Sequence, residues 1–389
     1  MSEAENTLRY TALVAVMLFL SVSLAAGQVK VRLFASQTPD FAVFTVVAGE
    51  YTLDGNGTFG KNDIIVISRY NGRMAVKPRQ AGGFVADTVM LRATSDSSSF
   101  MLRVSTQTAA AQRYTGHLVC YPDMATMVMI NSCPLNDYIA GTVRTEGGAN
   151  RHGEFIKTQA IITRTYLYRH MDRHTRDGYN VCDNTHCQAF HGITDDAAIN
   201  RATAETSGMV ILDGDSALIN SAFHSNCGGM TAASEDVWVS RLPYLRSVAD
   251  PWCVNSRNAS WERKLTLGQW VACLQSEGYT GQANNTSLFS FQTQARAVNY
   301  QTGTFHVPLE TIRQHLRLRS SYFSVETSAD TVTLKGRGYG HGVGLCQEGA
   351  MQMAARGKTA SQIISFYYTG VTVASLKNAR PETGQLHGK

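Results

Sequence analysis

Glycine at every second position over one stretch restricts the fold of this sequence more than any other feature. Residues 336–345, GRGYGHGVGL, carry five glycines in strict alternation with larger side chains. Because successive side chains of an extended chain point to opposite faces, a strand here is bare on one face. Two interpretations follow: a strand against which a long, flat ligand lies, or a tight backbone crossing inside a barrel. A phosphate-binding loop is disfavoured, since its irregular glycine spacing and its Lys-Ser or Lys-Thr are absent.

The length and the charge of the chain set broad limits. Its 389 residues, 43% of them hydrophobic, suffice for two or three domains with a substantial core. The net charge of +5 is not concentrated in any run, so we expect no nucleic-acid partner.

The beginning of the chain is typical of an export signal. An apolar run over residues 11–26 follows Arg9 and ends in small residues. We predict a signal peptide over 1–26, with an uncleaved signal anchor in the membrane as the alternative. The protein is then exported to the periplasm or cell envelope, where its eight cysteines can form disulfides.

The remaining pattern predicts an α+β fold with a helical catalytic core and β-rich regions flanking a substrate groove. Short alternating apolar segments make 27–134 β-rich. Helices are expected from about residues 135 and 154, over 195–212 and in 347–370, within a region 135–376 that precedes a tail over 377–389.

The first candidate functional residue is Glu146, at the end of a short helix and followed by two glycines. Alone it is better explained as a solvated helix-end carboxylate. The next helix is apolar on two sides, and its remaining face carries Lys157 and Arg164, two turns apart. Buried cations need partners, and Glu146 is the nearest candidate carboxylate, for a structural ion pair or for a substrate cleft.

A loop rich in cysteine and histidine follows. Cys182, His186 and Cys187 are suitable zinc ligands, with His174 or His170 as the fourth, although the common zinc-finger spacing is absent. Free or disulfide-bonded thiols are the alternative. Further on, His224 and Ser225 adjoin each other, but the chain has no Gly-x-Ser-x-Gly motif, which argues against a serine hydrolase.

Six segments in one order give the chain a family resemblance. They are LNDYIAGTVRTE, KTQAIITRTYLYR, CDNTHCQAFHG, AFHSNCGGMTAASEDVW, LPYLRSV and GRGYGHGVGLCQEGAMQMAARGKTASQIISFYYTGV. Between about Leu135 and Val373 the chain resembles the stage II sporulation protein D family, which includes peptidoglycan lytic transglycosylases and amidase enhancers.

The resemblance implies roles for individual residues. Glu146 matches the catalytic glutamate of the family, and the glycine-rich strand would flank a groove for a glycan chain. Substrate-binding roles are expected for Lys157, Arg164, His224, Ser225, Tyr244, Arg246, Tyr339, His341 and Gln347. Some members bind a structural zinc through two Cys and two His; Cys182, His186 and Cys187 match, and His174 is a candidate at shifted spacing.

Two positions depart from the family. Cys253 stands where Asp is common and Cys227 where a small polar residue is usual, which suggests that the pair forms a disulfide.

The implied activity is lytic cleavage of the bond between MurNAc and GlcNAc in peptide-free glycan, with 1,6-anhydro ends and no cofactor required for catalysis. The alternatives are a non-catalytic binder that enhances a cell-wall amidase, and a zinc hydrolase at the Cys-His loop. Glycan strands are the expected partner; an amidase partner and a homodimer are compatible with the sequence.

Overall fold

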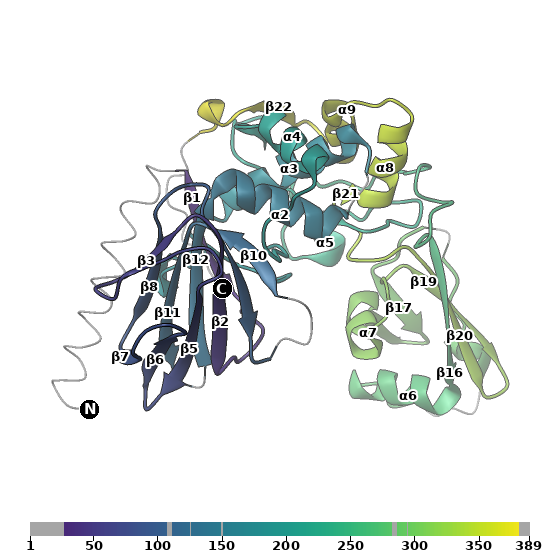
Figure 1. Ribbon diagram of the computed structural model, residues 1–389. Helices are drawn as coiled ribbons and strands as arrows, with labels where there is room; N and C mark the ends of the chain where they lie inside the picture. The colour runs from purple at the N-terminus through teal and green to yellow at the C-terminus, as the bar shows by residue number, and fades with distance from the viewer. Residues whose placement is uncertain are drawn as a thin grey trace. The chain divides into compact units, whose positions relative to one another are not determined.

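The computed structural model describes residues 27–106, 111–124, 126–148, 151–281, 286–293 and 295–380 (Figure 1). The chain divides into two compact units: unit 1 is Met1–Asn150 with Leu167–Ser207, and unit 2 is Arg151–Tyr166 with Gly208–Lys389. The predicted signal segment 1–26 lies outside the described residues. Within them, no helix has both the length and the apolar character needed to span a membrane.

Unit 1 is built on two β-sheets. Its strands are β1 (Gln28–Leu33), β2 (Phe41–Ala48), β3 (Tyr51–Leu53), β4 (Thr58–Phe59), β5 (Ile64–Tyr70), β6 (Arg73–Pro78), β7 (Phe84–Ala86), β8 (Val89–Ala93), β9 (Ser99–Val104), β10 (Gln112–Thr115), β11 (His117–Asp123), β12 (Thr126–Pro134) and β13 (Val181–Cys182). One sheet has the order β13-β1-β12-β11-β8-β3-β4 and the other β10-β9-β2-β5-β6-β7. The β-rich region is confirmed, and strands such as β2 and β6 bury every second side chain, whereas β12 is buried over seven consecutive residues.

Aromatic side chains fill the space between the two sheets. Phe44 and Phe100 of the six-stranded sheet stack with ring centroids 4.5 Å apart, and Tyr51 of the seven-stranded sheet meets both edge-on. Tyr114 continues the row and contacts Phe190, which follows the last strand of unit 1. The core therefore extends from the sheets to the segment that carries the candidate site.

The helices of unit 1 are α2 (Leu135–Gly147), the last turn of α3 (Gly153–Arg169), the 3-10 turn Thr175–Asp177 and α4 (Ala197–Glu205). The predicted starts near 135 and 154 are confirmed. The helix predicted over 195–212 is wrong in its second half: it ends at Glu205, and Met209–Leu212 form strand β14 of unit 2. Gly208, at φ +70°, turns the chain after the helix. The β-branched and apolar residues that follow it, Met209–Leu212, favour a strand.

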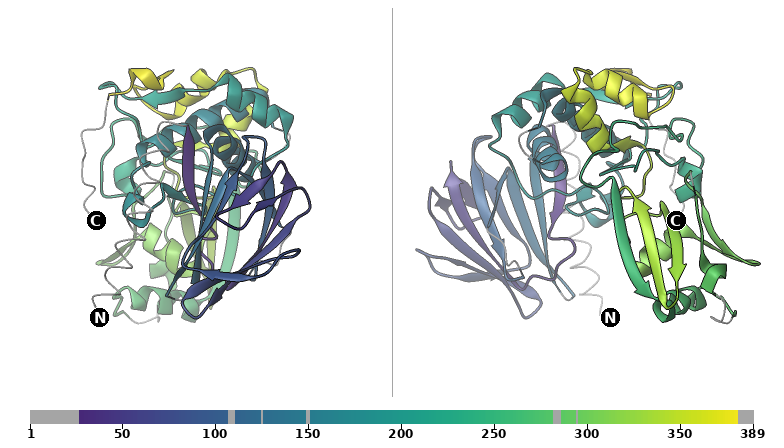
Figure 2. Two further views of the ribbon diagram at one scale, coloured as in Figure 1. Left: turned by 60° about the vertical axis from the view of Figure 1, so that its left-hand side comes forward. Right: turned by 90° about the vertical axis from the view of Figure 1, so that its right-hand side faces the viewer.

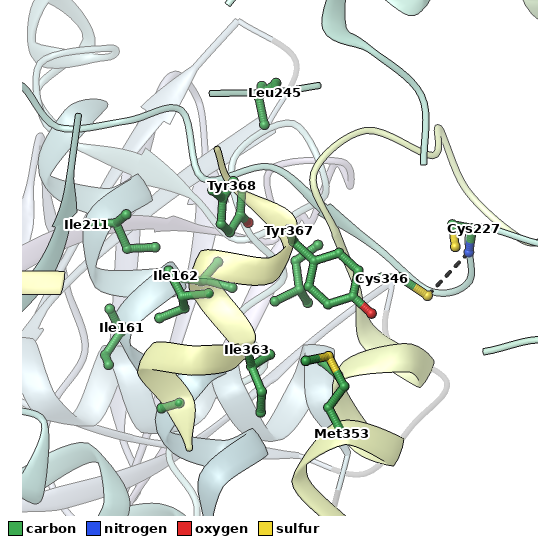
Figure 3. Packing of buried hydrophobic residues seen from close by; sticks show 14 of the residues in the cluster. Ile161, Ile162, Ile211, Cys227, Leu245, Cys346, Met353, Ile363, Tyr367 and Tyr368 are labelled. Atoms are coloured by element: carbon green, nitrogen blue, oxygen red, sulfur yellow. Dashed lines mark hydrogen bonds between the residues drawn. The ribbon is translucent and has the colours of Figure 1, made fainter. Parts of the chain in front are cut away.

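One part of unit 2 packs around α3. It contains β14 paired with β22 (Thr372–Ser375), β15 (Phe223–His224) paired with β21 (Leu345–Cys346), and helices α5 (Ser234–Val237), α8 (Gln347–Ala355) and α9 (Ala360–Tyr367). Ile161 and Ile162 of α3 pack in one core with Ile363 and Tyr367 of α9 (Figure 3). The final predicted helices are thereby confirmed.

A second part of unit 2 has its own core. Strands β16 (Ser260–Thr266), β20 (Thr331–Arg337) and β19 (Phe323–Ser328) lie side by side (Figure 2). Helices α6 (Leu267–Ser276) and α7 (Leu309–Leu316), the hairpin β17 (Asn299–Thr302) and β18 (Phe305–Pro308), and a 3-10 turn (Thr286–Phe289) accompany them. Trp270 and Tyr300 are fully buried in this cluster.

The glycine-rich stretch is not the extended strand that the alternation predicted. Strand β20 ends at Arg337, and the next four glycines have φ values of +77°, +108°, +83° and +72°. A Cβ on Gly338 would lie 2.5 Å from the carbonyl oxygen of Asn226, and one on Gly344 would lie 2.1 Å from that of Ala222. Of the two interpretations, the tight backbone crossing is therefore confirmed, although the segment crosses residues 222–228 in unit 2 and lies in no barrel.

Candidate functional site

Helix α2 places Glu146 in its last turn. The helix starts after Pro134, and Gly148, at φ +77°, ends it while donating its N–H to the Arg144 carbonyl at 3.2 Å. Glu146 is half-buried, and its Oε1 accepts a hydrogen bond from the Ala189 N–H at 2.9 Å. The carboxylate is thus held at a helix end by the backbone of a distant segment.

Residues 187–192 reach Glu146 because they pack tightly against α2. Gly141 allows this approach, since a Cβ there would lie 2.2 Å from the Gly192 carbonyl oxygen and 2.6 Å from the Phe190 ring. Tyr138 contacts Phe190 with ring centroids 5.1 Å apart and donates its hydroxyl to Gln188 at 3.3 Å. This packing fixes the Ala189 N–H at the carboxylate.

The environment of Glu146 favours its protonated form. Burial raises the pKa of Glu146, and this effect outweighs the Ala189 N–H and the charge of His191, which both lower it. A carboxylic acid with a raised pKa can donate a proton closer to neutral pH than an exposed glutamate.

The predicted zinc ligands come together in unit 1. Ligand atoms of His174, Cys182, His186 and Cys187 all lie within 4.8 Å of one another. His174 Nε2 is 3.5 Å from the Cys187 sulfur, and His186 Nδ1 is 3.6 Å from the Cys182 sulfur. Two thiols and two imidazoles in a compact group fit a tetrahedral zinc site, with His174 as the fourth ligand despite its spacing.

Neighbouring groups orient these side chains. Asp177 lies 3.5 Å from His174 Nδ1, which leaves Nε2 directed at Cys187. The hydrogen bond with Cys182 lowers the pKa of Cys187 to about 6. His170, the other histidine considered, instead contacts Arg173 at 3.3 Å.

In unit 2, the two cations of α3 have different surroundings. Lys157 is half-buried, and its Nζ lies 3.2 Å from Glu154 Oε1. Arg164 is completely buried, as its apolar helix predicted, and it donates to the Met209 carbonyl of β14 at 3.2 Å. Arg164 therefore ties α3 to the adjacent strand.

His224 and His341 form a neutral pair with ring centroids 5.5 Å apart. His341 accepts from the Val343 N–H at 3.0 Å and donates to the Phe223 carbonyl at 2.9 Å, which fixes its tautomer. Burial lowers the pKa of His341 to about 4 and that of His224 well below its usual value. Both rings therefore support the glycine crossing as uncharged groups.

Tyr244 and Arg246 make local contacts within unit 2. The Tyr244 hydroxyl accepts from the Asn220 N–H at 3.0 Å. Arg246 binds both carboxylate oxygens of Glu235, one of them at 2.6 Å, and Arg246 lowers the pKa of Glu235 to about 2. Glu235 was not among the predicted site residues, although it lies in the segment SEDVW, eleven residues before Arg246.

The remaining predicted residues differ in exposure. Tyr339 is 45% exposed, whereas Gln347 is buried and donates to Gln159 of α3 at 3.4 Å. Ser225 is half-buried, and its carbonyl accepts the Glu348 N–H of α8 at 3.0 Å. Tyr339 is thus the most accessible of these three residues.

A hollow of about 520 Å³ lies against β16, β19 and β20. Its lining includes Trp261, Tyr322, Glu326 and Arg337. Gly336 is essential to its form, because a Cβ there would lie 1.9 Å from the Trp261 ring. Aromatic rings beside charged groups suit a carbohydrate ligand, yet none of the residues predicted to bind substrate lines this hollow.

The predicted disulfide between Cys227 and Cys253 is not formed in the structure. The two sulfurs are 3.3 Å apart, well beyond a bond of about 2.05 Å, and all eight cysteines are free thiols. The prediction missed two further neighbours, Cys346 and Asp250, which lie in the same cluster. No local spacing connects these segments, so only the fold could reveal the group.

Comparisons with known proteins identify a matching family profile and several relatives of this chain. A family profile described as Stage II sporulation protein matches residues 123–212. The chain is 29% identical to stage II sporulation protein D of Bacillus subtilis (strain 168) over 264 residues, 63% of this chain and 76% of the relative. It is 30% identical to that of Bacillus amyloliquefaciens over 266 residues, 63% and 75% of the two chains. An amidase enhancer of Bacillus subtilis (strain 168) is 27% identical over 293 residues, 61% of this chain and 40% of the enhancer.

Proposed function

The chain belongs to the stage II sporulation protein D family, and we propose that it is a peptidoglycan lytic transglycosylase. It cleaves the bond between MurNAc and GlcNAc in peptide-free glycan and leaves 1,6-anhydro-MurNAc ends. Family membership supports a role in the cell wall, and the protein acts there, outside the cytoplasm. The observation that carries the proposal is Glu146, a half-buried acid with a raised pKa held by the Ala189 N–H.

One carboxylic acid suffices for this reaction. Protonated Glu146 gives its proton to the glycosidic oxygen as the C1–O bond breaks, and becomes a carboxylate. The carboxylate then takes the proton of the C6 hydroxyl, whose oxygen forms the new bond to C1. The acid is regenerated and no water is consumed, so the second carboxylate of ordinary glycosidases is unnecessary.

The substrate-binding residues of unit 2 divide by exposure. Lys157, Ser225 and Tyr339 retain accessible surface and contact the glycan directly. Arg164, His224, Tyr244 and Gln347 are buried and hold the binding elements in position. His341 and Arg246 also position these elements, through the contacts with Phe223, Val343 and Glu235.

A second candidate function is supported by the similarity to an amidase enhancer. In that case the protein binds glycan and stimulates a cell-wall amidase without cleaving the strand. Such a binder needs no acid, so the role of Glu146 distinguishes the two functions.

The deciding experiment is digestion of purified, peptide-free glycan followed by mass spectrometry. The wild type is expected to release products one water lighter than hydrolytic ones. Glu146→Gln is expected to fold and retain glycan in a pull-down but to form no anhydro product. Glu50→Gln, which changes an exposed carboxylate between strands β2 and β3 of unit 1, is the control and keeps activity. Full activity of Glu146→Gln, or hydrated products alone, would overturn the mechanism; glycan retention without any product from the wild type would favour the enhancer.

A further inference from the structure

Three cysteines from distant parts of the chain meet Asp250 in the interior of unit 2. The sulfurs of Cys227, Cys253 and Cys346 and a carboxylate oxygen of Asp250 all lie within 4.8 Å of one another. All four side chains belong to residues that are completely buried. The group is separate from the Cys-His cluster of unit 1 and shares no residue with it.

A disulfide cannot use this group fully. Three thiols allow one bond and leave the third sulfur and the Asp250 carboxylate beside it outside that bond. Four potential ligands around one point are instead the number that a closed structural metal site requires.

The backbone around Cys346 is arranged to stabilise a thiolate. The Cys227 N–H points at the Cys346 sulfur at 3.3 Å, as the dashed line in Figure 3 marks, and the Gly349 N–H approaches the same sulfur at 3.4 Å. Cys346 is also the N-cap of α8, where the helix dipole favours negative charge. Two N–H donors on one sulfur match the needs of a metal-bound thiolate.

Asp250 is oriented by groups outside the cluster. Its Oδ2 accepts the Tyr367 hydroxyl at 2.9 Å and its Oδ1 accepts the Trp252 N–H at 2.9 Å. Hydrogen bonds of this kind hold a ligating carboxylate in place around a metal. The sequence segment ADPWC therefore supplies both a ligand and the backbone donor that positions it.

We propose that Cys227, Asp250, Cys253 and Cys346 bind one structural Zn²⁺. Three thiolates and a carboxylate suit zinc in tetrahedral geometry, in which sulfurs at about 2.3 Å from the metal lie about 3.8 Å apart. The Cys227 and Cys253 sulfurs, now 3.3 Å apart, need to separate by only about half an ångström to reach that distance.

The charge of the site is compatible with its position. Four anionic ligands and Zn²⁺ leave a net charge of −2, which needs nearby positive charge and N–H donors. Arg296 provides a cation at the same turn, donating to the Cys227 carbonyl at 2.8 Å and to the Met230 carbonyl at 2.7 Å. The bound metal joins the 227 turn, the 250–253 segment and the start of α8, so its role is to stabilise unit 2. This proposal does not depend on the proposed function.

The test begins with full-length protein in which Cys182→Ser and Cys187→Ser remove the thiols of the other cluster. Elemental analysis is expected to find about one zinc per chain in this background, and X-ray absorption at the zinc edge is expected to find three sulfur neighbours and one oxygen. Adding Cys346→Ser should reduce zinc content at least tenfold under dialysis against a moderate chelator. Adding Cys273→Ser instead changes a buried cysteine outside the cluster and should leave zinc content unchanged.

Two results would overturn the proposal. One is a Cys227–Cys253 disulfide, seen as a linked peptide without reduction and a mass about 2 Da lower. The other is a folded chain that takes up no zinc when zinc is supplied, as measured by elemental analysis. If the Cys346→Ser variant fails to fold, the absorption spectrum of the intact cluster still decides the question.

Discussion

Ala189 donates its backbone N–H to Glu146 Oε1 at 2.9 Å, and Ala189 lies two residues after Cys187 of the Cys-His cluster. One short segment of unit 1 therefore carries both a candidate zinc ligand, Cys187, and the N–H that binds the candidate acid. Disturbing that segment is expected to affect both the stability of the unit and the state of the carboxyl group.

The raised pKa of Glu146 predicts how its replacement changes stability with pH. Burial makes the folded chain hold this proton at pH values where the unfolded chain has lost it, so the free energy of unfolding falls as pH rises through the window between the two pKa values. Glu146→Gln removes this loss. The variant should gain stability relative to wild type as pH rises above the ordinary glutamate pKa of 4.5, measured by urea unfolding, whereas the exposed Glu50→Gln should show no such gain. A constant difference between Glu146→Gln and wild type at all pH values would contradict the burial argument.

Removing one ligand of the Cys-His cluster should destabilise unit 1. We expect Cys182→Ser to lose the zinc of unit 1, one metal per chain, and to lower the melting temperature by several degrees, because this metal closes the loop that precedes Ala189. Cys120→Ser, at a buried cysteine of strand β11, is the control for exchange of a buried thiol and should retain its metal. Scanning calorimetry with elemental analysis checks both; a stable, active wild type without zinc would remove the metal from unit 1.

The low pKa of His341 predicts acid sensitivity of unit 2. Below pH 6.5 the unfolded chain binds a proton that the folded His341 accepts only near pH 4, so stability falls as pH falls through this window. The loss amounts to about 3 kcal/mol for a shift of this size, and His224 adds to it in the same direction.

The variant His341→Gln can accept from Val343 and donate to Phe223 without titrating, so its unfolding free energy should depend less on pH. His306→Gln, at an exposed position of β18, is the control. Equal pH dependence of wild type and His341→Gln would show that this histidine does not set the acid limit.

The glycine crossing predicts a difference between two Gly→Ala changes. Gly344 and Gly357 both have positive φ, at +72° and +81°, so alanine at either position costs about 1 kcal/mol in backbone strain. A Cβ at Gly344 also lies 2.1 Å from the Ala222 carbonyl oxygen, whereas nothing lies within 4 Å at Gly357. We therefore expect Gly344→Ala to destabilise the protein by at least about 2 kcal/mol more than Gly357→Ala, measured by chemical unfolding. Similar losses would mean that the segments separate easily.

Patterns within short segments predicted much of this protein. Alternating apolar residues indicated the strands before residue 134, and Gly147 with Gly148 indicated the end of α2 beside Glu146. The candidate zinc ligands between His174 and Cys187 also lie close in sequence, so the sequence could indicate them before the fold was known. The alternation at 336–345 misled the strand prediction, because glycine permits positive φ as readily as an extended backbone.

The sequence by itself therefore determined the local elements and the residue types that do chemistry, since both depend on neighbouring residues. Only the tertiary structure decided which distant groups meet. Ala189 reaches Glu146 across 43 residues, and Cys227 reaches Cys346 across 119, through the packing of Phe190 against α2 and the close crossing at Gly344. Such contacts arise from side-chain volume and backbone clearance summed over the whole fold, and no pattern within one segment encodes them.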